Sequence, residues 1–310
     1  MQTPQYNSIK IKNIPKIKIY QKPLIPMEKK LTAQGPTNRK SYTVTLPIEW
    51  VKEQKLDKSK QIDLEVVGNK IVLSQKSQTT LRETLDLSHY PHVPIKVLQG
   101  LYRLGVDEIK LLNLKPIQLE QIASILTKLI GYEIIEQKSN YLLIKDITKE
   151  SSESFDTVLR RIFLLILELS RTPHIHSPQI HILDNNIKKL INYCQRILIK
   201  SSYSDYHKIP FYYTLLDQLE KITDEYTWLP SSSLSLSNPT LANINLCLQN
   251  AYDIYYKFDA ERYDTYTFKT HELRKSLKLT DKSSLAQLHL HNLARLLNSL
   301  YGTIFILRYR

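Results

Sequence analysis

Apolar residues recur along this chain with two different periods, and the change of period divides it into parts. Between residues 27 and 79 they occur in short runs that alternate with polar residues, which is typical of strands with one buried face. From residue 149 to residue 310 they recur every three or four positions, which is typical of amphipathic helices packed together. The pattern therefore predicts an α+β protein with several domains.

The strand-rich part, residues 27–79, is predicted to be a small β-domain. Strands are expected at residues 42–46, 61–66 and 70–74, with the hairpin signal Gly68-Asn69 between the last two. A short helix is expected to begin at Pro47. So few short strands cannot enclose a large core, which favours dimerisation through this domain.

A basic arm precedes this domain. Residues 1–26 contain five lysines, several prolines and no acidic residue, which predicts a flexible segment. The alternation of apolar residues over residues 9–19 would instead fit an edge strand, and this alternative stays open.

Residues 80–148 read as a small α/β domain. Its expected elements, in order, are a helix at residues 95–104, a strand at 108–112, a helix at 119–130, and a hairpin with strands at 132–136 and 141–144. Gly131 stands where the second helix must end. No residue pattern here points to chemistry, so we interpret the domain as a scaffold or spacer.

The last part, residues 149–310, is predicted to be an all-α bundle. Five helices are expected, near residues 155–169, 183–197, 211–222, 239–259 and 284–307, with a serine-rich break at 230–238. Residues 252–266 combine tyrosines with four acidic residues. Because these acids would repel nucleic acid, we interpret the stretch as a bundle face or a protein-binding surface.

Charge and composition narrow the function. The net charge is +13, and residues 1–80 hold 15 Lys and Arg against 6 Asp and Glu, so +9 of the total lies in the first quarter. This placement favours a polyanionic partner such as nucleic acid. The six glycines are too widely spaced to form a phosphate-binding loop, and the two cysteines have no CxxC partner.

The sequence also lacks the features of enzymes, membrane proteins and secreted proteins. It contains no GxSxG or HExxH motif, so we expect no enzymatic activity. Its apolar runs are shorter than the roughly 18 residues that a membrane span needs, and its first residues do not form a signal peptide. We therefore expect a cytoplasmic protein without membrane insertion.

A family resemblance is carried by residues 41–51, Ser-Tyr-Thr-Val-Thr-Leu-Pro-Ile-Glu-Trp-Val. With the Gly-Asn hairpin that follows, this segment resembles the swapped-hairpin DNA-binding domain of the AbrB/SpoVT family. It departs from that pattern in the loop at residues 35–40, which is usually glycine-rich, and at Ser59-Lys60, where Gly-Asp is usual.

The resemblance extends along the chain to archaeal regulators related to the PhoU phosphate-uptake proteins. The run LIGYEIIEQ at residues 129–137 resembles their linker domain, and LLDQLEKITDEY at residues 215–226 resembles the PhoU helical bundle. The resemblance implies a homodimer that binds double-stranded DNA and regulates phosphate uptake or a related transport response. The bundle would then be a sensor, or would dock a transporter or signalling protein.

Six residues are candidate DNA contacts. Arg39, flanked by Asn38 and Lys40, is placed both to neutralise phosphates and to read bases, since Arg can bind guanine and Asn can pair with adenine. The other candidates, Lys29, Lys30 and Lys52, would be positioning contacts. The alternative is a PhoU-like signalling adaptor that binds a transporter or kinase, in which the β-domain serves only to dimerise. Steeply salt-dependent DNA binding would separate the two functions.

A divalent or ferric cation at the bundle is the one cofactor that the resemblance implies. Glu220 and Asp224 lie four residues apart and would share a helix face, as in the metal-binding pairs of PhoU proteins. The corresponding positions are eroded, because Lys188 follows Asp184 and because Asn298 and Gly302 replace acids. We therefore interpret the pair as a solvated helix face, and interpret the histidines at 174, 176, 181, 289 and 291 as surface residues.

Overall fold

The computed structural model describes residues 28–36, 39–53, 56–67, 70–74, 80–148, 155–172, 178–200, 206–229 and 238–309. The chain divides into two compact units, one formed by residues up to 65 with 72–76, the other by residues 66–71 with those from 77 onward. The predicted basic arm and the hairpin turn Gly68-Asn69 lie outside the described residues.

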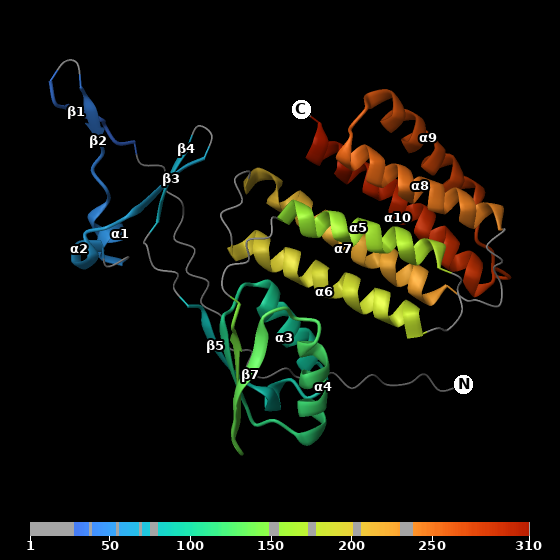
Figure 1. Cartoon of the computed structure of the whole chain (residues 1–310), viewed down its shortest axis with the longest axis horizontal. Coiled ribbons are helices and arrows are strands. Elements are labelled where there is room, and N and C mark those ends of the chain that lie inside the picture. Colours follow the sequence, from blue (N-terminus) through green and yellow to red (C-terminus); the bar gives the residue numbers. More distant parts are fainter. Residues whose placement is uncertain are drawn as a thin grey trace, which may run out of the picture. The chain divides into compact units, whose positions relative to one another are not determined.

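The described residues between 28 and 74, which we call the β unit, form two two-stranded sheets, β1-β2 and β3-β4, and two short helices (Figure 1). Of these residues, 66–71 group with the second compact unit. The elements are β1 (Thr32–Gln34), β2 (Ser41–Thr43), α1 (Ile48–Glu53), α2 (Leu56–Ser59), β3 (Asp63–Val67) and β4 (Lys70–Ser74). The strand predicted at residues 42–46 ends at Thr43, because Thr43 pairs with the first residue of the three-residue strand β1. The helix predicted after Pro47 is confirmed, and the Val51 N–H donates to the Pro47 carbonyl (3.0 Å).

Residues 80–148, the α/β subdomain, form a four-stranded sheet in the order β5-β6-β8-β7. Its elements are β5 (Arg82–Asp86), η1 (Leu87–His89), α3 (Pro94–Arg103), β6 (Glu108–Leu112), α4 (Pro116–Leu126), β7 (Tyr132–Gln137) and β8 (Tyr141–Asp146). β5 and β6 are parallel, while β8 is antiparallel to both of its neighbours. The order of the helices and of the strands from β6 onward matches the sequence prediction, but α4 begins and ends three to four residues earlier than predicted. β5 was not predicted, because this edge strand has three charged residues among five.

One face of this sheet is buried under α3 and α4, which lie on the same side of it (Figure 1). Alternate residues of β6 and β8 are buried, which is the period expected of a sheet with one covered face. Gly131 follows α4 and has φ +91°, a conformation that favours glycine. An added Cβ here would also lie 2.6 Å from the Asp146 carboxylate.

Residues 155–309, the helical bundle, form a layered set of long helices around one apolar core (Figure 1). Their bounds are α5 (Phe155–Arg171), α6 (Pro178–Lys200), η2 (Tyr206–Lys208), α7 (Ile209–Trp228), α8 (Pro239–Tyr256), α9 (Ala260–Ser276) and α10 (Leu285–Arg308). Five of these helices were predicted. The prediction missed α9 because its apolar stripe is weak and Thr270 is its buried residue.

The tyrosine-rich stretch spans the end of α8 and the start of α9. The Asp259 carboxylate caps α9 by accepting from the Arg262 N–H (2.8 Å), so the helix predicted to reach residue 259 ends at Tyr256 instead. Tyr255 is buried and Tyr263 packs against the core. Of the two interpretations of this stretch, packing within the bundle is confirmed.

Candidate nucleic-acid interface

The loop between β1 and β2 is shaped by one glycine. Gly35 has φ +102°, and a Cβ at this position would lie 2.7 Å from the Arg39 carbonyl oxygen. The Arg39 N–H donates to the Pro36 carbonyl (2.9 Å), which turns the chain back toward β2. Side-chain hydrogen bonds from Ser41 to the Gln34 carbonyl and from Thr43 to the Thr32 carbonyl support the paired strands. The loop therefore needs glycine at residue 35.

Five of the six predicted DNA contacts are exposed cations of the β unit. Lys29 and Lys30 precede β1, Arg39 and Lys40 leave the turn before β2, and Lys52 lies in the last turn of α1. In the register of this pair, Arg39 and Lys40 lie at the turn end, whereas Lys29 and Lys30 lie beyond its opposite end. Asn38 lies outside the described residues.

The β unit leaves much apolar surface exposed. Leu56 is buried at 7% exposure, but seven other apolar side chains are between 46% and 68% exposed: Leu31, Tyr42, Val44, Ile48, Leu64, Val66 and Ile71. Leu64 and Val66 are alternate residues of β3 and so share one face of that strand. So many exposed apolar side chains in a small unit are typical of an interaction surface.

Comparison with known proteins gives one result for this region. Residues 37–80 match the family of the antidote-toxin recognition protein MazE, a bacterial antitoxin. The matched segment runs from the Gly35–Lys40 turn through the β3–β4 hairpin, and it supports the AbrB-like DNA-binding domain predicted from residues 41–51. No curated protein and no solved structure matches the chain.

The two carboxylates predicted at a metal site are paired with basic side chains. Glu220 accepts from Arg103 Nη2 (3.1 Å), and Asp224 lies 2.8 Å from Lys188 Nζ. Lys188 is also 2.8 Å from Asp184. Burial lowers the pKa of Lys188, but the hydrogen bonds that its ammonium donates to both aspartates outweigh this and raise the pKa, which keeps the ammonium charged. In the described part of the chain, no three His, Cys, Asp or Glu side chains come together as metal ligands.

The histidines have structural contacts where they are described. His289 Nδ1 lies 2.7 Å from Glu225 Oε2, and His291 Nδ1 lies 2.6 Å from the Leu277 carbonyl oxygen. His181 is exposed on α6, while His174 and His176 lie outside the described residues. Among the helices that the structure describes, none has the length and apolar character of a bilayer span.

Sequence reasoning missed a polar stripe on α6. Five polar residues recur there at intervals of four, and three of them are buried: Asp184, Asn192 and Arg196, with Lys188 and Lys200 more exposed. The spacing was visible in the sequence. The stripe was overlooked because the apolar residues between these positions were sufficient to predict the helix.

Proposed function

We propose that this protein is a DNA-binding transcriptional regulator that acts as a homodimer through its β unit. The family match at residues 37–80 is the observation that carries the proposal, because domains of the MazE and AbrB kind typically dimerise and bind DNA. The exposed Gly35 turn, with Arg39 and Lys40 leaving it, supports the same function.

Dimerisation through the β unit follows from its exposed apolar surface. A single copy leaves Leu64 and Val66 at 60% and 68% exposure on one face of β3. Burial of apolar surface contributes roughly 25 cal/mol per Å², so a second copy covering this face would supply the core that one copy lacks. We propose that the swapped-hairpin arrangement of AbrB proteins achieves this.

DNA binding would divide between positioning and reading. Lys29, Lys30 and Lys52 would neutralise phosphates, which supplies affinity without sequence preference. Arg39 would bind a guanine edge through two donors, and Asn38 would pair with adenine. A dimer would present two such loops to one duplex.

The remaining parts are assigned by the resemblance. We propose that the helical bundle is the sensor or partner-docking part of a cytoplasmic regulator of phosphate uptake or a related transport response, and that the protein acts by binding rather than by catalysis. A transporter or signalling protein would be its macromolecular partner. The pairing of Glu220 and Asp224 with Arg103 and Lys188 favours their use in ion pairs over a cation site.

The test begins with selection of duplexes from a random-sequence pool by the full chain. Arg39→Ala should then weaken binding to the selected duplex by about 1–3 kcal/mol, or about 5- to 150-fold, and weaken binding to random DNA much less. Arg161→Ala, which removes an exposed arginine from α5, is the matched control and should change neither affinity. Equal losses on both DNAs would refute base reading by Arg39. Absence of any DNA binding would favour the adaptor.

A further inference from the structure

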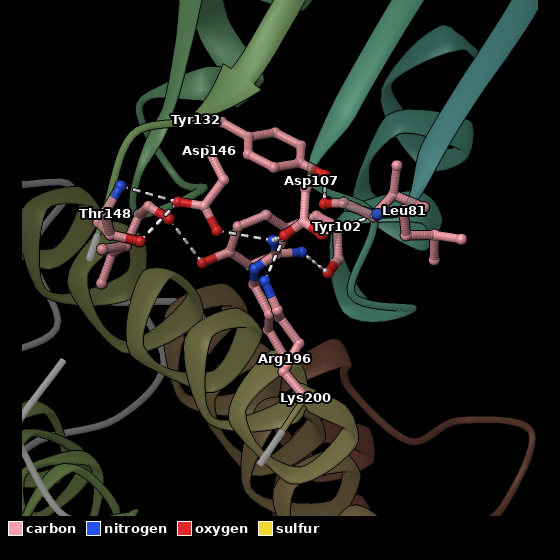
Figure 2. A network of polar contacts seen from close by, with 10 residues as sticks. Leu81, Tyr102, Asp107, Tyr132, Asp146, Thr148, Arg196 and Lys200 are labelled. Carbon is pink, nitrogen blue, oxygen red and sulfur yellow. Dashed lines mark hydrogen bonds and ion pairs between the residues drawn. The ribbon is translucent and has the colours of Figure 1, made fainter. Parts of the chain in front are cut away.

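The polar stripe of α6 connects the helical bundle to the α/β subdomain. Figure 2 shows Arg196 extending from α6 toward the strand ends of the subdomain. Its side chain is 4% exposed and its Nη2 lies 2.6 Å from Asp146 Oδ2 and 3.1 Å from Asp107 Oδ1. One guanidinium thus bridges two carboxylates at the same end of the sheet, where Asp107 precedes β6 and Asp146 ends the antiparallel β8.

The rest of the guanidinium is also engaged by the subdomain. Its Nη1 donates to the Tyr102 carbonyl (2.9 Å), and its central carbon lies 4.9 Å from the Tyr102 ring centroid and 5.3 Å from that of Tyr132. The two rings meet edge to face at 4.9 Å. Arginine suits this place because it combines a planar fork of donors with a face that stacks on aromatic rings.

Both carboxylates also accept hydrogen bonds from the first and last segments of the subdomain. Asp107 Oδ2 accepts from the Leu81 N–H (3.0 Å), and Lys200 of α6 also pairs with Asp107. Asp146 Oδ1 accepts from the Thr148 N–H (3.0 Å). Leu81 immediately precedes β5 and Thr148 follows β8, so the cluster fixes the points where the chain enters and leaves the subdomain (Figure 2).

A second polar contact lies one helical turn away. Asn192 Oδ1 accepts from Gln99 Nε2 (2.9 Å) and Arg103 Nε (2.8 Å), both on α3. Arg103 also reaches Glu220 on α7. The contact between the helical bundle and the α/β subdomain therefore includes several polar interactions. Because polar interactions are directional, they fix the relative position of the bundle and the subdomain better than an apolar contact would.

We propose that Arg196 is a coupling residue, which holds the α/β subdomain and the helical bundle as one body and connects α6 through Asp107 to Leu81. Leu81 stands seven residues after the end of β4 in the chain, so we expect a change at α6 to affect the DNA-binding unit through the chain connection. This regulatory role rests on the proposed function. Coupling between two binding sites is reciprocal, so DNA binding must also alter α6.

The experiment compares the full chain with a triple variant, Arg196→Met, Asp107→Asn and Asp146→Asn. Replacing all three charges together avoids leaving a buried charge unpaired, so the variant is expected to fold. Arg160→Met is the matched control, because Arg160 also lies over a tyrosine ring, that of Tyr256 (5.0 Å), but within the bundle. Residue-resolved hydrogen exchange is measured with and without the selected DNA duplex.

Three results are expected. In the triple variant without DNA, the Leu81 amide should exchange about tenfold faster, since it loses a charged acceptor. In the wild type and in Arg160→Met, DNA should change the exchange of α6 amides. In the triple variant, the same DNA should change exchange only before residue 81.

Other results would overturn the proposal. Unchanged Leu81 exchange in the triple variant would refute the clamp, and an equal DNA effect on α6 in both proteins would refute the coupling. Bound DNA that leaves α6 unchanged in the wild type would refute it as well. Failure of the wild type to bind any DNA would instead refute the proposed function, and the Leu81 exchange would still decide on the clamp.

Discussion

Replacing Gly35 by alanine should weaken DNA binding without unfolding the protein. The turn requires φ +102° at this residue, and the new Cβ would lie 2.7 Å from the Arg39 carbonyl oxygen. Since this oxygen belongs to the residue assigned to base reading, the strain is relieved only by moving Arg39 or the turn that holds it.

The expected loss of DNA affinity can be estimated from the backbone conformation of residue 35. A residue with a Cβ pays about 1–2 kcal/mol for a left-handed conformation, and 1.4 kcal/mol corresponds to a tenfold change in an equilibrium constant. If DNA binding needs the turn as it stands, Gly35→Ala should weaken affinity about 5- to 30-fold. The overlap with the Arg39 oxygen places the expected value toward the upper end.

The assay is fluorescence anisotropy with a labelled duplex, and the control is Gly100→Ala. Gly100 lies in α3, where a Cβ meets nothing within 4 Å, so this substitution should leave DNA affinity unchanged. It should also stabilise the helix by about 0.5–1 kcal/mol in urea unfolding. If Gly35→Ala binds DNA as tightly as the wild type, the turn geometry does not serve DNA binding.

Three further predictions concern stability and reactivity. Burial opposes ionisation of Asp146, but hydrogen bonds from Thr148 and Arg196 outweigh it and lower its pKa below the ordinary 3.8, so its stabilising effect is present at neutral pH and is lost as the pH falls through the lowered value. Urea unfolding between pH 7 and pH 2 should therefore depend less on pH in Asp146→Asn, and an unchanged slope would contradict this. Burial raises the pKa of Cys247 to about 11 and also raises that of Cys194, so both thiols should resist alkylation at pH 8 in the native protein and react in urea, with mass spectrometry as the readout. Leu297→Ala, at a fully buried position of α10, should lower the free energy of unfolding by about 2–5 kcal/mol, whereas Leu285→Ala, at 58% exposure, should cost much less.

Local periodicity predicted most of the fold because the elements bury one face. The strand at Glu108–Leu112 was predicted to the residue, since alternate side chains enter the core. β5 was missed because an edge strand buries little and its sequence is charged. α9 was missed for the related reason that it buries little, with Thr270 as its buried residue.

The site was only partly predictable. Charge placement and the motif at residues 41–51 pointed to the β unit, which the family match supports. The Arg196 cluster could not be predicted, because Leu81, Asp107 and Asp146 are distant in sequence and meet α6 only in the folded chain. The same applies to Glu220, whose partner Arg103 is 117 residues away.

The most direct test of DNA binding is the salt dependence of affinity for the full chain and two charge variants. In the first variant, glutamine replaces the five exposed cations of the β unit, Lys29, Lys30, Arg39, Lys40 and Lys52. In the control, glutamine replaces five exposed cations of the helical bundle, Arg161, Lys257, Lys275, Lys278 and Lys282.

Each phosphate contact contributes about −0.9 to the slope of log K against log salt, so loss of the contacts assigned to Lys29, Lys30 and Lys52 should flatten the slope by about 2.7 per protomer. The flattening would reach about 4.5 if Arg39 and Lys40 also contact phosphates. The control should keep the wild-type slope, although its net charge changes equally. Equal slopes for all three proteins would contradict the assignment of DNA binding to the β unit.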